Sequence, residues 1–218
     1  MNEKEISKII GVCQPFTSTN KKRQLDLIQK TIHCVENGVG GDYVETGVFR
    51  GGSSMTIASV LQHYSRLQTL WCYDTYEGMP EPSPQEIKLC GKKPALQIYK
   101  DRMKLDEGWC KCSLEQVKKN MDKHVGYPYV KYIKGMVEDT LPNHKPNKIA
   151  LLRLDTDFYE STAVSLEYLY PRLVSGGYIM IDDYGAFSGC RKAVDDYFKN
   201  KLPKFEYKDG SAIGFFKP

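Results

Sequence analysis

Two short runs of apolar residues constrain the fold of this chain more than any other feature. The runs IALL (residues 149–152) and YIMI (residues 178–181) are nearly continuous rather than alternating in polarity. Runs of this kind are typical of strands in parallel sheets whose two faces are both covered. Each run is followed within a few residues by aspartates, which mark a polar edge of the sheet. The two runs therefore predict an α/β fold with a buried, mostly parallel sheet.

Strand and helix patterns alternate about five times along the chain, which indicates helices on both faces of that sheet. The expected helices are residues 21–37, 51–64, 114–123, 160–173 and 190–200, and the expected strands are residues 42–47, 67–74, 129–135, 148–157 and 178–181. Ser113 is a suitable N-cap for the helix that follows it, and Gln116 completes a capping box. Residues 204–209 and 211–218 predict a terminal antiparallel hairpin that turns at Asp209 and Gly210.

A long segment without a clear periodic pattern covers residues 75–112 and carries four prolines, at positions 80, 82, 84 and 94. Such a segment inside a compact domain is usually either a functional lid or disordered. Its aromatic and aliphatic residues favour packing on the rest of the protein. We therefore interpret residues 79–112 as a lid over the active site. The length of 218 residues fits one domain, in which residues 1–38 form a helical N-terminal region.

The net charge of +4 excludes few functions, but its distribution is informative. The lysines form no long basic run, which argues against a nucleic-acid partner. No apolar run approaches the roughly 18–20 residues that a membrane span requires, and the N-terminus MNEKEISKII is too polar for a signal peptide. We therefore expect a cytoplasmic protein without a membrane partner.

The seven cysteines include no CxxC pair. Scattered reduced thiols in a cytosolic protein are one interpretation. The alternative is a zinc site in which Cys90 and a histidine join Cys110 and Cys112.

Four of the expected strands end on acidic residues. These are Glu45, Asp74, Asp155 with Asp157, and Asp182 with Asp183. One acid at such a position is often the N-cap of the next helix. The carboxyl ends of parallel strands, however, meet at one edge of the sheet, and ligands bind there near the point where the strand order reverses. Acids at four strand ends point to a shared ligand or metal ion.

The segment ETGVFRGGSS joins the first expected strand to a helix. Its glycines, Gly47 and Gly51-Gly52, permit a tight turn and a close approach of the backbone. The spacing is not GxGxxG, and the carboxylate of Glu45 would repel a pyrophosphate, so a dinucleotide is disfavoured and a cationic ligand is favoured. Asp74 at the end of the next strand is placed to accept hydrogen bonds from ribose hydroxyls. An ordinary turn and a helix cap are the alternatives for these two features.

Adjacent carboxylates at Asp182 and Asp183 repel each other unless something neutralises them. Together with Asp155 they form the hard, oxygen-rich ligand set that Mg²⁺ or another divalent cation prefers. The alternative is that one aspartate caps a turn and the other faces solvent. Asp157 lies two residues beyond Asp155 and points the same way in extended chain. It is predicted to be a general base acting on a hydroxyl whose pKa the cation lowers, or else to cap the helix that begins near Glu160.

Taken together, several segments resemble the macrocin O-methyltransferase family, which acts on sugar hydroxyls in macrolide and aminocoumarin biosynthesis. They occur in the family's order from about residue 20 to the C-terminus, as GDYVETGVFRGGSS, YDTYEGMPEP, CSLEQVKKNM, YIKGMVEDTLP, LLRLDTDFYEST and YPRLVSGGYIMIDDYGAFSGCRKAVDDY. The resemblance implies the Rossmann-like fold of class I S-adenosylmethionine (SAM) methyltransferases. That fold has a mostly parallel seven-stranded sheet, a C-terminal antiparallel hairpin and helices on both faces.

The resemblance also implies a role for individual residues. Methionine-end contacts to SAM fall on Glu45, Thr46 and Gly47, the ribose contact on Asp74, and adenine contacts on Gly135, Met136, Val137 and Glu138. Ser53 is a further expected cofactor contact. The metal ligands fall on Asp155, Asp182 and Asp183, and the catalytic residues on Asp155 and Asp157. Other family members place a histidine near the base, but no histidine follows His144 here, which supports Asp157. Thr46 and Thr156 depart from the Cys and Gly that are common in the family.

The expected function is SAM-dependent and divalent-metal-dependent methyl transfer to a sugar or glycan that has vicinal hydroxyls, such as a rhamnose-like deoxyhexose. The family also suggests a homo-oligomer. Three alternatives remain at this point. They are a catechol-type O-methyltransferase, a binding protein that kept the fold but lost catalysis, and an NAD-dependent oxidoreductase, which the lack of GxGxxG disfavours.

Overall fold

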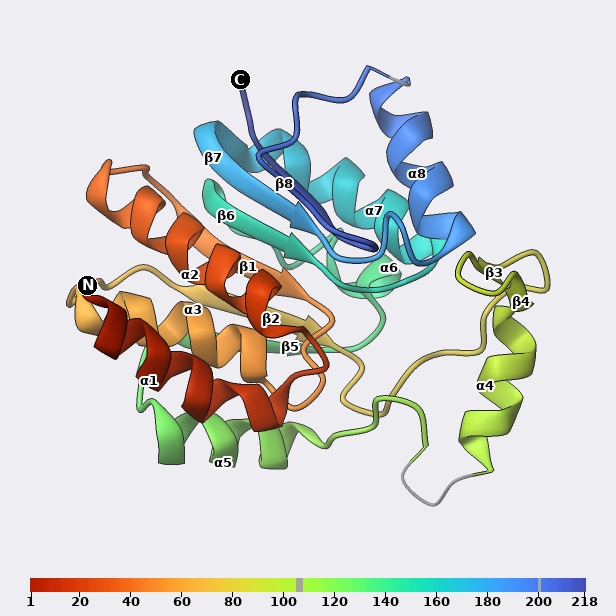
Figure 1. Ribbon diagram of the computed structural model, residues 1–218, viewed down its shortest axis with the longest axis horizontal. Helices are drawn as coiled ribbons and strands as arrows, with labels where there is room; N and C mark the ends of the chain where they lie inside the picture. The colour runs from red at the N-terminus through yellow and green to blue at the C-terminus, as the bar shows by residue number, and fades with distance from the viewer. Residues whose placement is uncertain (105–107, 200) are drawn as a thin grey trace.

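A seven-stranded sheet forms the centre of the computed structural model, which describes residues 1–104, 108–199 and 201–218 (Figure 1). The strand order is β5-β2-β1-β6-β7-β9-β8. The bounds are β1 Asp42–Thr46, β2 Leu70–Asp74, β5 Val130–Lys134, β6 Ile149–Leu154, β7 Leu173–Ile181, β8 Tyr207–Lys208 and β9 Ile213–Phe216. Strands β5, β2, β1, β6 and β7 are parallel to one another, whereas β9 is antiparallel to β7 and to β8. The predicted fold, with its terminal antiparallel hairpin, is confirmed.

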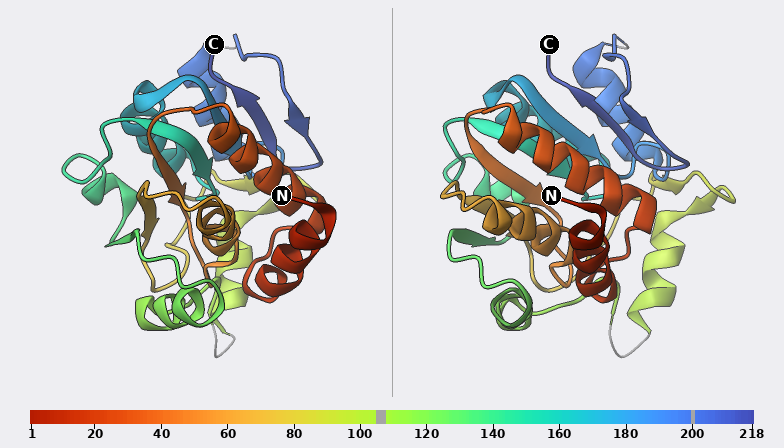
Figure 2. Two further views of the ribbon diagram at one scale, coloured as in Figure 1. Left: turned by 90° about the vertical axis from the view of Figure 1, so that its left-hand side faces the viewer. Right: turned by 60° about the vertical axis from the view of Figure 1, so that its left-hand side comes forward.

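Helices cover both faces of the sheet (Figures 1 and 2). One face carries α1 Glu3–Cys13, α2 Lys21–Glu36, α3 Gly52–His63 and α5 Leu114–His124, and the other carries α6 Val137–Thr140, α7 Tyr159–Leu169 and α8 Ser188–Phe198. Each face encloses its own apolar cluster, because side chains alternate along a strand. Tyr43 and Leu151 belong to the first cluster, and Val44 and Leu152 to the second. All six residues of β6 are buried, as its apolar run predicts.

Local signals in the sequence explain where several helices begin and end. Ser113 accepts a hydrogen bond from the amide of Gln116, as predicted, but the side chain of Gln116 donates to Asn120 rather than back to the cap. The expected helix at 160–173 ends as an α-helix at Leu169, and a 3-10 turn over Tyr170–Arg172 contains Pro171, which lacks an amide hydrogen. The expected helix at 190–200 begins earlier, at Ser188, and residue 200 lies outside the described residues.

The segment after β2 is more regular than its sequence suggests. It contains a short antiparallel pair, β3 Ile87–Lys88 and β4 Lys93–Pro94, followed by the helix α4 Ala95–Met103. Figure 1 shows this segment on the side of the sheet toward which the strand arrows point. Residues 105–107 of the expected lid lie outside the described residues. The name lid is used below for the described part of the predicted segment, residues 79–104 and 108–112.

The strand order places a switch point between β1 and β6. The chain leaves β1 toward β2 and later returns to the other side of β1 with β6. The connections that follow these two strands therefore run in opposite directions and leave a crevice at their carboxyl ends, where such folds bind ligands. Within the described residues, no helix is long and apolar enough to cross a membrane.

Candidate functional site

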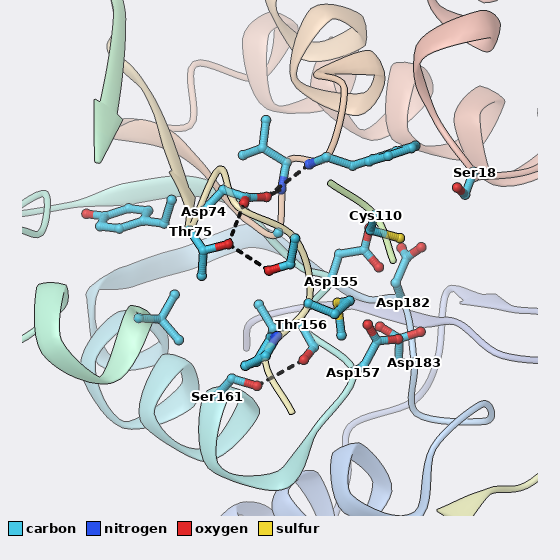
Figure 3. A pocket seen from close by; sticks show the side chains of 18 of the residues that line it. Ser18, Asp74, Thr75, Cys110, Asp155, Thr156, Asp157, Ser161, Asp182 and Asp183 are labelled. Carbon is cyan, nitrogen blue, oxygen red and sulfur yellow. Dashed lines mark hydrogen bonds between the residues drawn. The ribbon is translucent and has the colours of Figure 1, made fainter. Parts of the chain in front are cut away.

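A cavity of about 330 Å³ lies at this switch point, and Figure 3 shows it from close by. Its walls come from the ends of the five parallel strands, the lid and the segment between α1 and α2. Most of the predicted site residues line it, namely Gly47, Ser53, Asp74, Gly135, Met136, Val137, Glu138, Asp155, Asp157, Asp182 and Asp183. Residues from well-separated parts of the sequence are thus brought to one edge of the sheet.

Gly47 is required where β1 ends beside β6. Its φ is +82°, and a Cβ atom there would lie 1.8 Å from the carbonyl oxygen of Asp155. The amide of Gly47 donates to the carbonyl of Tyr73 on β2 at 2.8 Å. Because only glycine adopts this conformation without steric cost, Gly47 allows three neighbouring strand ends to approach one another.

Asp74 connects the end of β2 to the glycine loop. Its Oδ2 accepts hydrogen bonds from the amides of Val48 at 2.7 Å and Phe49 at 3.0 Å. Its Oδ1 accepts from the amide of Tyr76 at 2.7 Å. The carboxylate lines the cavity (Figure 3), and a carboxylate has about four lone-pair sites. The hydroxyl of Thr75 also lies 3.4 Å from Oδ1, but it donates to the carbonyl of Gly78 at the shorter distance of 2.8 Å. Asp74 therefore orders the loop, and the acceptor site that Thr75 contacts only at long range is the one open to a ligand hydroxyl.

Residues 135–138, which follow β5, form the part of the cavity wall next to Asp74. Gly135 has a φ of +138°, and a Cβ atom at this position would lie 2.9 Å from Cγ2 of Thr140. Its amide donates to the carbonyl of Asp74 at 3.0 Å, which places this wall beside the end of β2. The carboxylate oxygen Oε2 of Glu138 is buried without a hydrogen-bond partner. This wall thus combines apolar surface with one free acceptor.

Arg153 lies fully buried beneath the cavity and was not predicted as a site residue. Its guanidinium contacts Glu45 at 2.5 Å, Asp155 at 2.9 Å and Asp182 at 2.8 Å. The register explains this, because Arg153 lies opposite Glu45 on β1 and Met180 on β7. Burial alone would lower the pKa of Arg153, but Asp155, Asp182 and Glu45 hold it well above its ordinary value. The signal in the sequence was an arginine inside an otherwise apolar strand.

Glu45 and Thr46 lie behind the cavity wall rather than in it. Glu45 is fully buried, and its carboxylate also accepts a hydrogen bond from Ser54. Burial raises the pKa of Glu45 to about 7, although Arg153 and Ser54 act in the opposite direction. The hydroxyl of Thr46 is buried without a partner, while its carbonyl accepts from the amide of Asp155. In this arrangement Glu45 contributes to the site through Arg153.

Asp157 and Asp183 form a pair of carboxyl groups in contact (Figure 3). Burial, and then the charge of Asp155, raise the pKa of Asp157 to about 7. Burial and the charge of Asp157 also raise the pKa of Asp183 well above its ordinary value. Two such groups share a proton when no cation lies beside them. Asp157 has a φ of +62°, a strained conformation for a residue other than glycine and one that is found most often at functional sites.

The aspartates of the cavity have carboxylate oxygens that could bind a divalent cation. Oδ1 of Asp182 and Oδ2 of Asp183 are buried without hydrogen-bond partners. When they are all ionised, the five carboxylates of Asp182, Asp183, Asp155, Asp157 and Glu45 outnumber the two guanidinium groups of Arg23 and Arg153. The donor chemistry therefore fits Mg²⁺. As they stand, however, no three His, Cys, Asp or Glu side chains in the described part of the chain are grouped to hold a metal ion. The zinc site, which the sequence left as an alternative, has no such group among these residues either. We call Asp155, Asp157, Asp182 and Asp183 the acidic edge of the cavity. There, Arg153 and Arg23 both contact Oδ2 of Asp182.

Further cavity residues were not singled out from the sequence, and they lie before α2, in the lid and before α8. Thr17, Ser18 and Thr19 precede α2, and the hydroxyl of Thr17 lies 3.3 Å from that of Ser53. Trp109 in the lid and Phe187 form an aromatic wall of the cavity, with ring centroids 6.4 Å apart. Phe158 packs behind this wall, with its ring centroid 6.2 Å from that of Trp109. Hydroxyl-rich and aromatic walls are suited to a polar ligand with apolar faces.

The comparisons with known proteins agree with this geometry. Residues 13–205 match the macrocin-O-methyltransferase (TylF) family. The chain belongs to the macrocin O-methyltransferase family. A solved relative, the O-methyltransferase NovP, superimposes with a TM-score of 0.79 at 29% identity and covers 93% of this chain and 82% of its own. The class I SAM methyltransferase fold implied by the sequence is thus shown.

Two curated macrocin-type relatives have names that describe their reactions. The 8-demethyl-8-(2,3-dimethoxy-alpha-L-rhamnosyl)-tetracenomycin-C 4'-O-methyltransferase of Streptomyces olivaceus is 41% identical over 181 residues, which are 80% of this chain and 65% of the relative. The demethyldecarbamoylnovobiocin O-methyltransferase of Streptomyces niveus is 35% identical over 170 residues, 75% of this chain and 62% of the relative. The chain thus spans slightly less than two thirds of the length of these relatives.

Proposed function

We propose that the protein is a SAM-dependent O-methyltransferase that acts on a sugar hydroxyl. The observation that carries the proposal is the cavity itself. A glycine turn, Asp74 and residues 135–138 line one part of it, while four aspartates line another. The first part suits a nucleoside with a cationic sulfonium tail, and the second suits a hydroxyl acceptor. The names of the relatives, which describe methylation of rhamnosyl and other natural products, support a sugar acceptor.

On this proposal Asp74 accepts hydrogen bonds from the ribose, and Gly135, Met136, Val137 and Glu138 surround the adenine. Gly47 and Ser53 lie beside the methionine portion. Glu45 and Thr46 support that portion from behind through Arg153 and the backbone of Asp155. When bound, SAM supplies an electrophilic methyl group. The chain's part is to hold the reacting atoms in line, because positioning accounts for much of the rate gain in such reactions.

Asp155, Asp182 and Asp183 are the residues that would hold Mg²⁺ or another divalent cation. When bound, such an ion lowers the pKa of a neighbouring hydroxyl and neutralises the crowded carboxylates. Asp182 would hold the ion without losing its arginine partners, because its Oδ1 has no hydrogen-bond partner while its Oδ2 contacts Arg23 and Arg153. Asp157 then accepts the proton of the acceptor hydroxyl at its carboxylate, since it borders the cavity beside Asp183.

The acceptor is best described as a sugar with vicinal hydroxyls, such as a deoxyhexose. Trp109 and Phe187 offer apolar faces to the sugar ring, and the neighbouring carboxylates accept hydrogen bonds from its hydroxyls. A catechol-type O-methyltransferase would use the same acidic residues but would bind a planar phenol. An assay that compares sugars with phenols therefore distinguishes the two functions.

Calorimetric titration with SAM, followed by release of S-adenosylhomocysteine with a panel of deoxysugars and phenols, tests the proposal. The assay is run with added Mg²⁺ and with a chelator. SAM binding together with sugar-dependent and Mg²⁺-dependent release is the expected result. Turnover on phenols alone would replace the acceptor class, turnover that survives the chelator would remove the metal, and failure to bind SAM would overturn the proposal.

A further inference from the structure

The lid contacts the connection between β7 and α8 through a short segment, residues 86–89. The amide of Ile87 donates to the hydroxyl of Ser188 at 2.9 Å, and the amide of Leu89 donates to the carbonyl of Ala186 at 2.8 Å. An antiparallel bridge joins Lys88 to Phe187. These contacts attach the lid to the connection between Asp183 and α8, and therefore to the acidic edge of the cavity.

Glu86 lies at the centre of this contact and is 4% exposed. Its Oε1 accepts a hydrogen bond from the amide of Tyr159 at 2.8 Å, and its Oε2 accepts from the amide of Gly189 at 3.0 Å. Tyr159 is the first residue of α7, and Gly189 is the second residue of α8. One carboxylate from the lid thus binds the N-termini of two helices.

Neither helix is capped by the residue that precedes it. The N-cap positions are Phe158 and Phe187, whose side chains make no capping hydrogen bond. Glu86 supplies the missing acceptors, and its negative charge lies where both helix dipoles favour it. A Cβ atom on Gly189 would lie 1.9 Å from Oε1 of Glu86, so the glycine makes room for this carboxylate.

The two helices directly follow the two connections that carry the acidic residues. Tyr159 comes two residues after Asp157, and the amide of Phe158 donates to the carbonyl of Thr156. On the other connection, the amides of Ala186 and Phe187 donate to the carbonyl of Asp183. The positions of the two helix N-termini therefore determine how Asp157 and Asp183 face each other.

We propose that Glu86 is a positioning residue that couples docking of the lid to the arrangement of Asp157 and Asp183. When the lid is docked, both helix N-termini are held by one carboxylate and the two acidic connections are fixed relative to each other. When the lid lifts, both helices lose their cap together. The inference about catalysis rests on the proposed methyl transfer, whereas the inference about capping does not.

The test compares Glu86→Gln with Glu81→Gln, which makes the same change at an exposed position of the same lid. Glutamine retains one acceptor oxygen but turns an NH₂ group toward the other amide.

Backbone hydrogen exchange is measured in the full chain by NMR. In Glu86→Gln we expect the amide of Tyr159 or Gly189 to exchange about tenfold faster, which corresponds to the loss of one cap. Glu81→Gln should exchange like the wild type. Glu86→Asp, which keeps the charge but is shorter, provides the same measurement if the glutamine variant does not fold.

The second readout separates positioning from general stability. At a temperature where both variants are folded, Glu86→Gln should lower kcat by about ten- to a hundredfold, as expected when reacting groups are misplaced by about 1 Å. The Kd for SAM should change by less than about threefold, because its proposed contacts lie after β1, on α3, at the end of β2 and around the start of α6. Unchanged exchange at both amides would overturn the capping role even if the wild type shows no methyl transfer. Faster exchange with unchanged kcat would overturn the coupling to catalysis.

Discussion

Arg153 holds three carboxylates that come from the ends of three strands, β1, β6 and β7. Buried charges are expensive unless each one is paired, and removal of one partner leaves the others uncompensated. The side chain of Arg153 is 1% exposed, so water cannot replace it. The geometry of the acidic edge therefore depends on a residue that touches the cavity only from below.

We expect Arg153→Met to destabilise the fold by about 3–5 kcal/mol, because Glu45, Asp155 and Asp182 would lose a shared cation. Chemical denaturation at pH 7 measures the change. Arg102→Met, at an exposed position on α4, is the matched control and should change the free energy of unfolding by less than about 0.5 kcal/mol. A loss at Arg153 no larger than that of the control would show that the network adds little to stability.

At Asp157, we expect substitution by Asn to lower methyl transfer by about 10²–10⁴-fold, the usual contribution of a general base. SAM binding should survive, since the residues assigned to SAM lie on other elements of the cavity wall. Single-turnover methyl transfer and calorimetry on the same preparation make the comparison. Unchanged turnover would remove Asp157 from the mechanism, and loss of SAM binding would indicate a role in the fold instead.

At the scale of elements, the turn after β1 is the most constrained connection. Gly47→Ala would place a Cβ atom within 1.8 Å of a backbone oxygen of Asp155 and force a φ of +82° on a non-glycine residue. We expect a loss of stability above about 1 kcal/mol together with weaker SAM binding, both followed by thermal unfolding with and without SAM. The control is Gly40→Ala, where an added Cβ atom meets nothing within 4 Å. Equal effects at the two glycines would contradict this account of the turn.

The sequence predicted the elements of the sheet better than it predicted the contacts between them. Apolar runs such as residues 149–152 identify buried strands, and an acid after a strand reaches the carboxyl edge by topology alone. Arg23 shows the limit of such patterns. It follows Lys21 and Lys22, and three basic residues at a helix start indicate a solvated surface. Only the packing of α2 against β7 and the hairpin brings Arg23 to Asp182, at 2.7 Å.

The lid shows a second limit, because its structure depends on partners distant in the chain. Residues 75–112 have no clear periodicity, yet β3, β4 and α4 form within them. The carboxylate of Glu86 is satisfied by amides 73 and 103 residues away. Local propensity does not carry such information. Asp182 is a further example. From the sequence we expect it to bind a metal ion, but its contacts with two buried arginines depend on the packing of distant elements.

At the scale of the whole molecule, Arg23 joins three distant parts of the chain. From α2 its guanidinium contacts Asp182 at the end of β7 and Asp209 in the turn between β8 and β9, the latter at 2.9 Å. Asp209 also accepts hydrogen bonds from the amides of Ser211 and Ala212 at 2.8 and 2.7 Å. Arg23 on α2 thus connects the terminal hairpin, through Asp209, to the acidic edge of the cavity, through Asp182.

This connection predicts a defined dependence of stability on pH. Burial alone would raise the pKa of Asp209, but the amides of Ala212 and Ser211 and the Arg23 guanidinium hold it well below its usual range. A carboxyl group whose pKa is depressed by folding stabilises the fold above its unfolded pKa, about 3.9. It loses that contribution as the pH falls toward the folded pKa.

Asp209→Asn should therefore lower the free energy of unfolding by about 1–3 kcal/mol at pH 7, as expected for hydrogen bonds to a charged group. The difference from the wild type should stay constant down to about pH 5 and shrink below about pH 4. Urea denaturation at several pH values measures this difference, with Asp122→Asn at an exposed position of α5 as the control. A difference that does not change with pH would mean that the charge of Asp209 is not what holds the hairpin to Arg23.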